Sequence, residues 1–324
     1  MKIELTLDEY FTGVKASDRS ILSRAITLIE STKKEHQALA EELIQKCLPF
    51  SGNSIRIGIT GVPGVGKSTF IESFGKHITN KGLKLAVLAI DPSSQKSGGS
   101  ILGDKTRMEE LSSNPNAFIR PTASAGSLGG VARATRETII LFETAGYDTI
   151  LVETVGVGQS ETTVHSMVDC FLLLLLAGAG DELQGIKRGI MEMADLISIN
   201  KADGDNINAA KRAAAQVKNS IHLFPATESG WIPQVETCSA INSLGLDNIW
   251  DNIKSFENNT KNSGYFTEKR QKQAIFWMHQ TIKEQLENRF YQDASIKEKL
   301  IKIEKALLNN EISSYQAAKN LLGE

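Results

Sequence analysis

The chain has 324 residues, 41% of them hydrophobic and 23% charged, so it is long enough to bury a sizeable core. Its 36 basic and 38 acidic residues leave a formal net charge of −2, which gives no overall reason to expect nucleic acid or an anionic membrane as a partner. The longest apolar run, residues 170–177, is far below the roughly 18 residues needed to cross a bilayer.

The amino terminus lacks the apolar segment of a signal peptide, so we expect the protein to be kept in the cytoplasm. Its three cysteines, Cys47, Cys170 and Cys238, are widely separated and form no C-x-x-C pair. We therefore predict reduced, structural cysteines rather than disulfides or a zinc site.

Residues 1–51 are predicted to form an N-terminal helical extension. Apolar residues recur at helical spacing between Ile21 and Ile29, and Ser17 and Asp18 are suitable cap residues before them.

From residue 52 the pattern changes to short apolar segments that alternate with helical ones. The predicted strands are IRIGIT (55–60), KLAVLAI (84–90), TILVET (149–154), CFLLLLLA (170–177) and LISIN (196–200). Because these segments are apolar throughout, they are expected to be buried on both faces, as in a parallel sheet covered by helices. Residues 52–256 are thus predicted to form an α/β domain with a doubly wound, mostly parallel sheet.

Residues 257–324 are predicted to form a C-terminal helical region, which begins with the polar stretch ENNTKNSG (257–264). Its apolar residues stand three or four positions apart, at Ile275, Met278, Ile282, Leu286 and Phe290. Periodicity alone does not separate a face packed on its own domain from an oligomer interface.

The segment GVPGVGKS (61–68) fits the phosphate-loop pattern G-x-x-x-x-G-K-[ST], and it stands between a predicted strand and a helix expected to begin at Lys67. Backbone N–H groups and a helix N-terminus would hold a phosphate chain, Lys67 would reach the β- and γ-phosphates, and Ser68 would ligate Mg²⁺. A glycine-rich turn that binds nothing is disfavoured because every fixed position matches in this context. The predicted nucleotide-binding residues here are Gly61, Val62, Pro63, Gly64, Val65, Gly66, Lys67, Ser68 and Thr69.

Two carboxylates end neighbouring strands, Asp91 after residues 84–90 and Glu153 within TILVET. Carboxylates at this edge of the sheet suit a magnesium-nucleotide site, although either could also simply cap a turn. Glu153 begins ETVG, where D-x-x-G is usual, and Gly156 would donate its N–H to the γ-phosphate. Val157 follows where Ras-like enzymes carry a water-orienting glutamine, so intrinsic hydrolysis is predicted to be slow.

The tetrapeptide NKAD (200–203) fits the N-K-x-D pattern of guanine-nucleotide sites. Guanine offers two adjacent donors that the carboxylate of Asp203 can accept together, whereas adenine has an acceptor at the matching ring nitrogen. Asn200 would tie this loop to the phosphate loop, and the stem of Lys201 would lie along the base. Ser239 and Ala240 resemble the second base loop, in which the N–H of Ala240 would meet the guanine carbonyl oxygen. GTP and GDP are therefore the predicted ligands.

The chain resembles the methylmalonyl-CoA mutase-associated GTPases, also called ArgK-type transport kinases. The resemblance is carried by GVPGVGKST, AIDPSS, GGSILGDKTRM, RPTASAGSLGGVA, ETVGVGQSE, GAGDELQGIKRGIMEMAD and NKADGDN, which extend over almost the whole chain. It implies a Mg²⁺-dependent GTPase, usually a homodimer, that gates adenosylcobalamin loading and protects an acyl-CoA mutase. It also favours the C-terminal helical region, residues 257–324, as the dimerisation region. Methylmalonyl-CoA mutase is the first candidate client.

The resemblance also implies roles for residues that the motifs alone would leave as solvated loops. It places Asp104 with Asp91 and Glu153 near the metal, so that the predicted metal ligands are Ser68, Asp91, Asp104 and Glu153. It identifies residues 180–189 as a third switch, from which Gln184 and Lys187 could reach the phosphates, and it makes Arg107 another candidate phosphate contact. The predicted catalytic residues are Lys67, Glu153 and Lys187.

Two other functions remain open. A metal-delivery GTPase of the same class would usually carry clustered Cys or His ligands, but the five histidines are scattered. A kinase acting on a transport protein would need an acceptor site that no sequence feature marks, and NKAD favours GTP over ATP.

Overall fold

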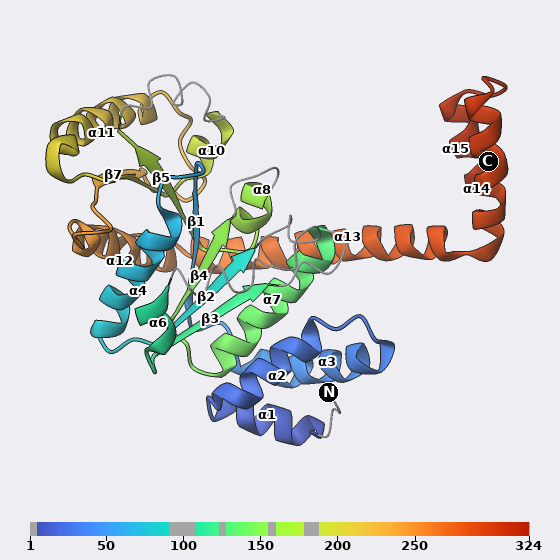
Figure 1. The fold of residues 1–324 in the computed structure, drawn as a ribbon, viewed down its shortest axis with the longest axis horizontal. Helices are drawn as coiled ribbons and strands as arrows, with labels where there is room; N and C mark the ends of the chain where they lie inside the picture. The colour runs from blue at the N-terminus through green and yellow to red at the C-terminus, as the bar shows by residue number, and fades with distance from the viewer. Residues whose placement is uncertain (1–4, 91–107, 123–127, 155–159, 178–187, 324) are drawn as a thin grey trace. The chain divides into compact units, whose positions relative to one another are not determined.

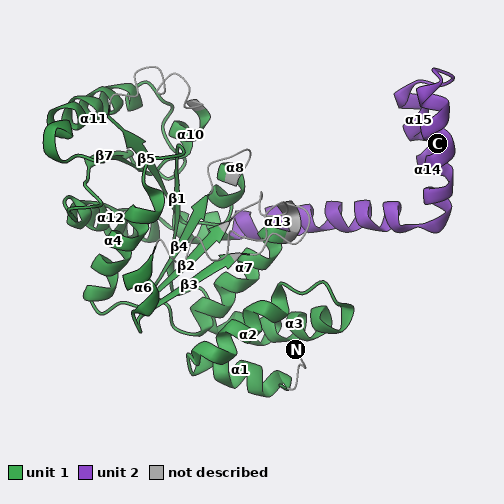
Figure 2. Ribbon diagram, in the orientation of Figure 1, with its two compact units in different colours: residues 1–270 green, residues 271–324 purple. Residues whose placement is uncertain are grey.

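The computed structural model describes residues 5–90, 108–122, 128–154, 160–177 and 188–323 (Figure 1). The chain divides into two compact units, Met1–Arg270 and Gln271–Glu324 (Figure 2).

Seven strands form one parallel sheet in the order β3-β2-β4-β1-β5-β6-β7, which confirms the predicted doubly wound α/β fold. The strands are β1 (Ile55–Gly61), β2 (Leu85–Ile90), β3 (Ala117–Thr122), β4 (Thr149–Thr154), β5 (Cys170–Leu176), β6 (Leu196–Asn200) and β7 (Gln234–Thr237). The sequence patterns missed β3, because Arg120 and Pro121 interrupt its apolar run. Proline is tolerated there because β3 is an edge strand that pairs only with β2.

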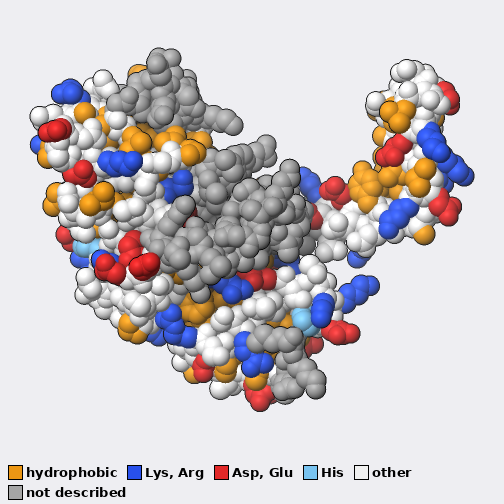
Figure 3. Space-filling model, in the orientation of Figure 1, with side chains coloured by type: hydrophobic (Ala, Val, Ile, Leu, Met, Phe, Trp, Pro, Cys, Tyr) orange, Lys and Arg blue, Asp and Glu red, His pale blue; other side chains and the backbone are white. Residues whose placement is uncertain are grey.

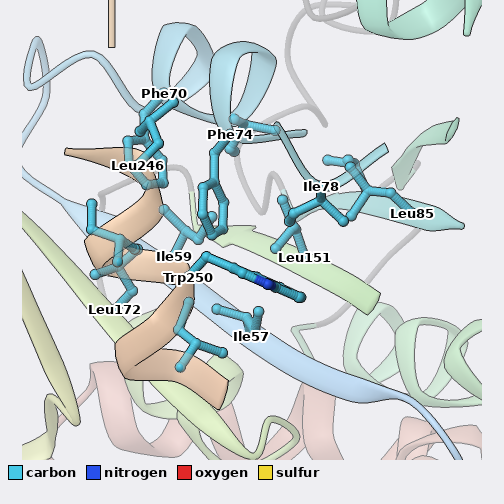
Figure 4. Packing of buried hydrophobic residues seen from close by; sticks show 14 of the residues in the cluster. Ile57, Ile59, Phe70, Phe74, Ile78, Leu85, Leu151, Leu172, Leu246 and Trp250 are labelled. Atoms are coloured by element: carbon cyan, nitrogen blue, oxygen red, sulfur yellow. The ribbon is translucent and has the colours of Figure 1, made fainter. Parts of the chain in front are cut away.

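Successive side chains along each strand point to opposite faces of the sheet, so they pack against different helices. Ile57 and Ile59 of β1 face α4 (Lys67–Asn80) and α12 (Leu246–Ser263), where the rings of Phe74 and Trp250 meet at 6.2 Å (Figure 4). The helices of the opposite face are α7 (Leu128–Thr144), α8 (Ser160–His165), α10 (Arg188–Met193) and α11 (Ile207–Ile221). The core therefore covers both faces of the sheet, as the continuous apolar strands predicted.

Three helices precede the sheet: α1 (Leu7–Lys15), α2 (Arg19–Ile29) and α3 (Lys34–Cys47), followed by a 3-10 turn, Leu48–Phe50. Asp18 caps α2 as predicted, because its carboxylate accepts from the backbone N–H groups of Ser20 and Ile21. All three helices contact α7. Arg19 donates to the carbonyl of Ala117 at 2.6 Å, which occupies a backbone acceptor at the start of the edge strand β3.

Between β2 and β3 lies α6 (Glu109–Ser113), and a 3-10 turn, Gly204–Asn206, precedes α11. The polar stretch 257–264, predicted to separate domains, is largely helical, because α12 continues to Ser263. This part of α12 is amphipathic. On its buried side lie Phe256 and Thr260, together with Glu257, whose carboxylate pairs with Lys254 and Lys261. The predicted boundary at 256/257 thus falls inside a helix, and the first compact unit extends to Arg270.

The remaining helices are α13 (Tyr265–Gln292), α14 (Ala294–Leu308) and α15 (Ser314–Leu322). Arg270 anchors the start of α13 to the first unit: its guanidinium donates to both carboxylate oxygens of Asp169 at 2.7 Å. It also donates to the carbonyls of Gly52 and Ser54 at 2.7 Å. Within residues 271–323, by contrast, Ala317 is the single buried residue. None of the described helices combines the length and apolar character needed to cross a membrane.

Candidate functional site

The phosphate loop joins β1 to α4 at the carboxyl edge of the sheet, as its motif predicted. Gly66 caps α4 in the left-handed conformation, with φ +91°, and a Cβ there would lie 3.1 Å from Asn200 Nδ2. Glycine suits this position because it adopts a positive φ without strain and has no Cβ to approach Asn200. Lys67 opens the helix and its Nζ donates to the carbonyl of Gly61 at 2.9 Å, so the lysine folds back over the loop.

The loop's remaining residues differ in exposure. Val65 is fully buried in the core and Val62 packs against it, which fixes the loop from below. Pro63, Gly64 and Thr69 are exposed and Ser68 is half-buried. Pro63, Gly64 and the half-buried Gly66 and Ser68 are therefore open to a ligand at the start of α4.

Two carboxylates act electrostatically on the ammonium of Lys67. Burial lowers the pKa of Lys67, and the charges of Glu153 and Glu161 act in the opposite direction. Glu153 is the second-to-last residue of β4, where it pairs in register with Ile59 of β1, and only 7% of it is exposed. A buried carboxylate whose charge acts on a lysine that opens a helix is in keeping with a magnesium-nucleotide site.

The NKAD segment is tied directly to the phosphate loop. Asn200 ends β6, is 1% exposed, and donates from Nδ2 to the carbonyl of Val65 at 2.9 Å. Lys201 has φ +57° and donates from Nζ to the carbonyl of Gly64 at 2.9 Å. Two segments 135 positions apart in the chain are thus held as one surface.

The second base loop supports the first. The hydroxyl of Ser239 donates to Asp203 Oδ2 and so orients the carboxylate that is predicted to read guanine. The N–H of Ala240, predicted to meet the guanine carbonyl, donates here to Asn200 Oδ1 at 3.2 Å. Binding of the base by this N–H stays a proposal, and it requires the N–H to be shared with or released from Asn200.

Cys238 supports the site in a way that sequence reasoning missed. Its buried thiol lies 3.4 Å from Asn200 Oδ1, and Ser198 donates to its sulfur at 3.1 Å. Burial raises the pKa of Cys238 to about 11, so the thiol stays protonated and can donate. Its position directly before Ser239 was the only available signal. All three cysteines are free and buried.

Several predicted site residues lie outside the described residues: Asp91, Asp104, Arg107, Gly156, Val157, Gln184 and Lys187. Of the predicted metal ligands, Ser68 and Glu153 are described; Ser68 supplies a hydroxyl from α4 and Glu153 a buried carboxylate from β4. Such oxygen donors suit Mg²⁺. In the described part of the chain no group of three or more His, Cys, Asp or Glu side chains could hold a metal ion.

The family described as "Methylmalonyl Co-A mutase-associated GTPase MeaB" matches residues 22–295, most of the chain. The chain belongs to the MeaB family. The resemblance inferred from the motifs is confirmed, and with it the assignment to the P-loop GTPases.

Relatives support this membership along nearly the full length. This MeaB-family chain is 48% identical over 288 residues to "GTPase ArgK" of Escherichia coli, which covers 89% of this chain and 87% of the relative. It is 46% identical over 326 residues to the mouse "Methylmalonic aciduria type A homolog, mitochondrial", covering 98% and 79%. The solved structure described as "Crystal structure of LAO/AO transport system kinase" superposes with a TM-score of 0.79 at 38% identity, covering 100% and 98%.

Proposed function

We propose that this protein is a Mg²⁺-dependent GTPase that acts as a chaperone for an adenosylcobalamin-dependent acyl-CoA mutase, with methylmalonyl-CoA mutase the first candidate. The observation that carries the proposal is the MeaB family match together with the direct link from Asn200 to the phosphate loop. That link joins a phosphate-binding element to a guanine-reading one. In this role the protein gates cofactor loading and protects the mutase.

Guanine selectivity rests on Asp203. Its carboxylate accepts from Ser239, which holds it in one orientation while it keeps acceptor capacity for the two adjacent donors of guanine. Adenine would present an acceptor to the same carboxylate and be repelled. GTP is therefore the proposed substrate, with GDP and phosphate as products.

Hydrolysis would divide the work among a few groups. Lys67 moves from the Gly61 carbonyl to the β- and γ-phosphates, and Ser68 with Glu153 holds Mg²⁺, aided by Asp91 and Asp104. When bound, Mg²⁺ would supply positive charge that offsets the negative charge developing on the phosphates. Lys187 is proposed to add a further positive charge when the mutase binds, which would stabilise the transition state.

Single-turnover GTP hydrolysis, with and without saturating mutase, tests the client assignment. We expect the mutase to accelerate the parent protein, and Lys187→Ala to remove most of that acceleration while leaving basal hydrolysis and GTP affinity nearly unchanged. Equal acceleration of both proteins would exclude Lys187 as the responding group. If no adenosylcobalamin-dependent mutase of the host accelerates the parent, the chaperone proposal is wrong.

We also propose a homodimer formed through the second compact unit. Its helices expose Ile275, Met278, Ile282 and Leu286, each by between 47% and 60%, so this stripe is largely open to solvent. Figure 3 shows hydrophobic side chains open to solvent on this unit. A second copy would remove that surface from water.

Light scattering with Ile282→Glu tests the dimer, and Lys283→Glu on the adjacent exposed position is the matched control. We expect the first variant to be monomeric and the second to remain dimeric. A dimeric Ile282→Glu variant would assign the interface elsewhere.

A kinase is the second candidate, because the superposing solved structure is described as a transport system kinase. The destination of the γ-phosphate separates the two functions: release as inorganic phosphate supports a GTPase, and transfer to a protein supports a kinase. A cytoplasmic location is part of the proposal and agrees with three free, buried cysteines.

A further inference from the structure

Helix α8 lies unusually close to the strand that leads into the phosphate loop. A Cβ built on Gly58 of β1 would come within 2.9 Å of Val164 and 3.0 Å of Val168, and within 2.7 Å of Phe171 on β5. No side chain larger than hydrogen fits there. The absence of a side chain at Gly58 lets α8 pack directly on the backbone of β1.

This packing determines where the first turn of α8 lies. The helix contacts both β4 and β1, and it begins on the side where β4 ends. Glu161 stands three positions before Val164, so the two side chains share the helix face that is turned toward β1. Glu161 is therefore displaced from Gly58 toward Gly61, the last residue of β1.

Gly61 is also where Lys67 is held, through the hydrogen bond from Nζ to the Gly61 carbonyl. Glu161 and Lys67 thus approach the same end of β1 from opposite faces of the sheet, Glu161 from α8 and Lys67 from α4. The electrostatic influence of Glu161 on the Lys67 ammonium agrees with this closeness. Glu161 itself is half-buried, so its carboxylate is not sealed in the core.

A carboxylate at this position is not expected to contact the phosphates of GTP directly. Lys67 is the residue that meets the β- and γ-phosphates, so Glu161 lies at the γ-phosphate end of the site, where like charges repel. A carboxylate can, however, accept a hydrogen bond from a water that stands between it and the phosphorus. Val157 offers no such acceptor.

We propose that Glu161 orients the water that attacks the γ-phosphate of GTP. The water oxygen forms a bond to the γ-phosphorus, and the bond from that phosphorus to the β–γ bridging oxygen breaks, with its electron pair staying on GDP. One water proton remains on the inorganic phosphate and the other is released to solvent. Glu161 is thus a positioning residue, and its role rests on the proposed GTP hydrolysis.

Two other roles for Glu161 have different consequences. An acidic residue in the first turn stabilises a helix through the macrodipole, and that role requires only the charge. A role in holding the nucleotide would appear in affinity rather than in rate. Orientation of water requires the carboxylate at one distance from the γ-phosphate, and it appears in the rate alone.

The test compares Glu161→Gln, Glu161→Asp and Thr162→Ala in the full-length protein. Gln keeps the shape but loses the charge, Asp keeps the charge but withdraws the carboxylate by about 1.5 Å, and Thr162 is the exposed neighbour on the same turn. Single-turnover GTP hydrolysis and the Kd of a non-hydrolysable GTP analogue are measured for each, with circular dichroism melting as the fold check.

We expect Glu161→Gln and Glu161→Asp to slow hydrolysis at least about tenfold, with analogue binding unchanged or tighter and with Thr162→Ala at the parental rate. The proposal is overturned if Glu161→Gln hydrolyses within about threefold of the parent, or if it loses affinity and rate in parallel. A parental rate in Glu161→Asp would overturn it in favour of the macrodipole role. If the parent itself releases no phosphate from GTP, the proposed function fails instead, which separates the two failures.

Discussion

Replacing Asn200 by alanine should separate the base loop from the phosphate loop. The side chain is 1% exposed, and its amide nitrogen donates to the Val65 carbonyl at 2.9 Å. Its oxygen accepts from the Ala240 N–H at 3.2 Å and from the Cys238 thiol at 3.4 Å. Alanine supplies none of these contacts, so two backbone groups and a thiol lose their partner in a buried site.

The loss can be sized from these contacts. A hydrogen bond contributes about 0.5–1.5 kcal/mol net, and a buried group left without a partner costs about 1–3 kcal/mol. With two such groups, the Val65 carbonyl and the Ala240 N–H, the cost of Asn200→Ala is about 2–6 kcal/mol. These contacts hold both loops in the arrangement that binds nucleotide, so part of the lost free energy should weaken GTP binding. We expect that part to be at least about 1.4 kcal/mol, which corresponds to a tenfold higher Kd for GTP.

Fluorescence titration with a labelled GDP measures the affinity, and urea denaturation measures stability. Asn252→Ala is the control, since its half-buried amide donates to Glu236 at 3.0 Å away from the site. We expect the control to bind nucleotide like the parent. Asn200→Asp, which places an oxygen opposite the Val65 carbonyl, should bind no better than Asn200→Ala. Parental affinity and a stability loss below about 0.5 kcal/mol in Asn200→Ala would refute the reasoning.

Asp203→Asn should weaken GTP binding and shift preference toward xanthosine triphosphate, because an amide can donate to the extra xanthine carbonyl; unchanged GTP affinity in a titration would show that Asp203 does not read the base. Arg270→Met leaves the carboxylate of Asp169, 2% exposed, without its guanidinium, so urea denaturation should show a loss of about 3–5 kcal/mol. A loss below about 1 kcal/mol would contradict the anchoring role. Burial lowers the pKa of His165 from 6.5 to about 4, so the unfolded chain takes up the proton at a higher pH than the folded one. Stability from this group is complete above pH 6.5 and is lost as pH falls toward 4, and His165→Gln should flatten that part of a stability-against-pH curve.

Local motifs made much of the site predictable. The phosphate loop and the NKAD segment are each a single continuous stretch of sequence. The groups that bind the nucleotide are therefore placed by a local strand, turn and helix, which a short motif is enough to predict. The buried parallel strands could also be predicted from the sequence, because a strand covered on both faces is apolar throughout instead of alternating apolar and polar residues. Edge strand β3, with Arg120 and Pro121, lacked that signature.

The sequence by itself determined the family, the fold class and the identity of the phosphate and base loops. Only the tertiary structure decided how these parts meet, because each contact joins residues far apart in the chain. Asn200 reaches Val65 across 135 positions, Ser239 orients Asp203, and Arg270 ties α13 to Asp169. The bare backbone of Gly58 brings α8 and Glu161 toward Lys67, which no periodicity or motif spacing could indicate.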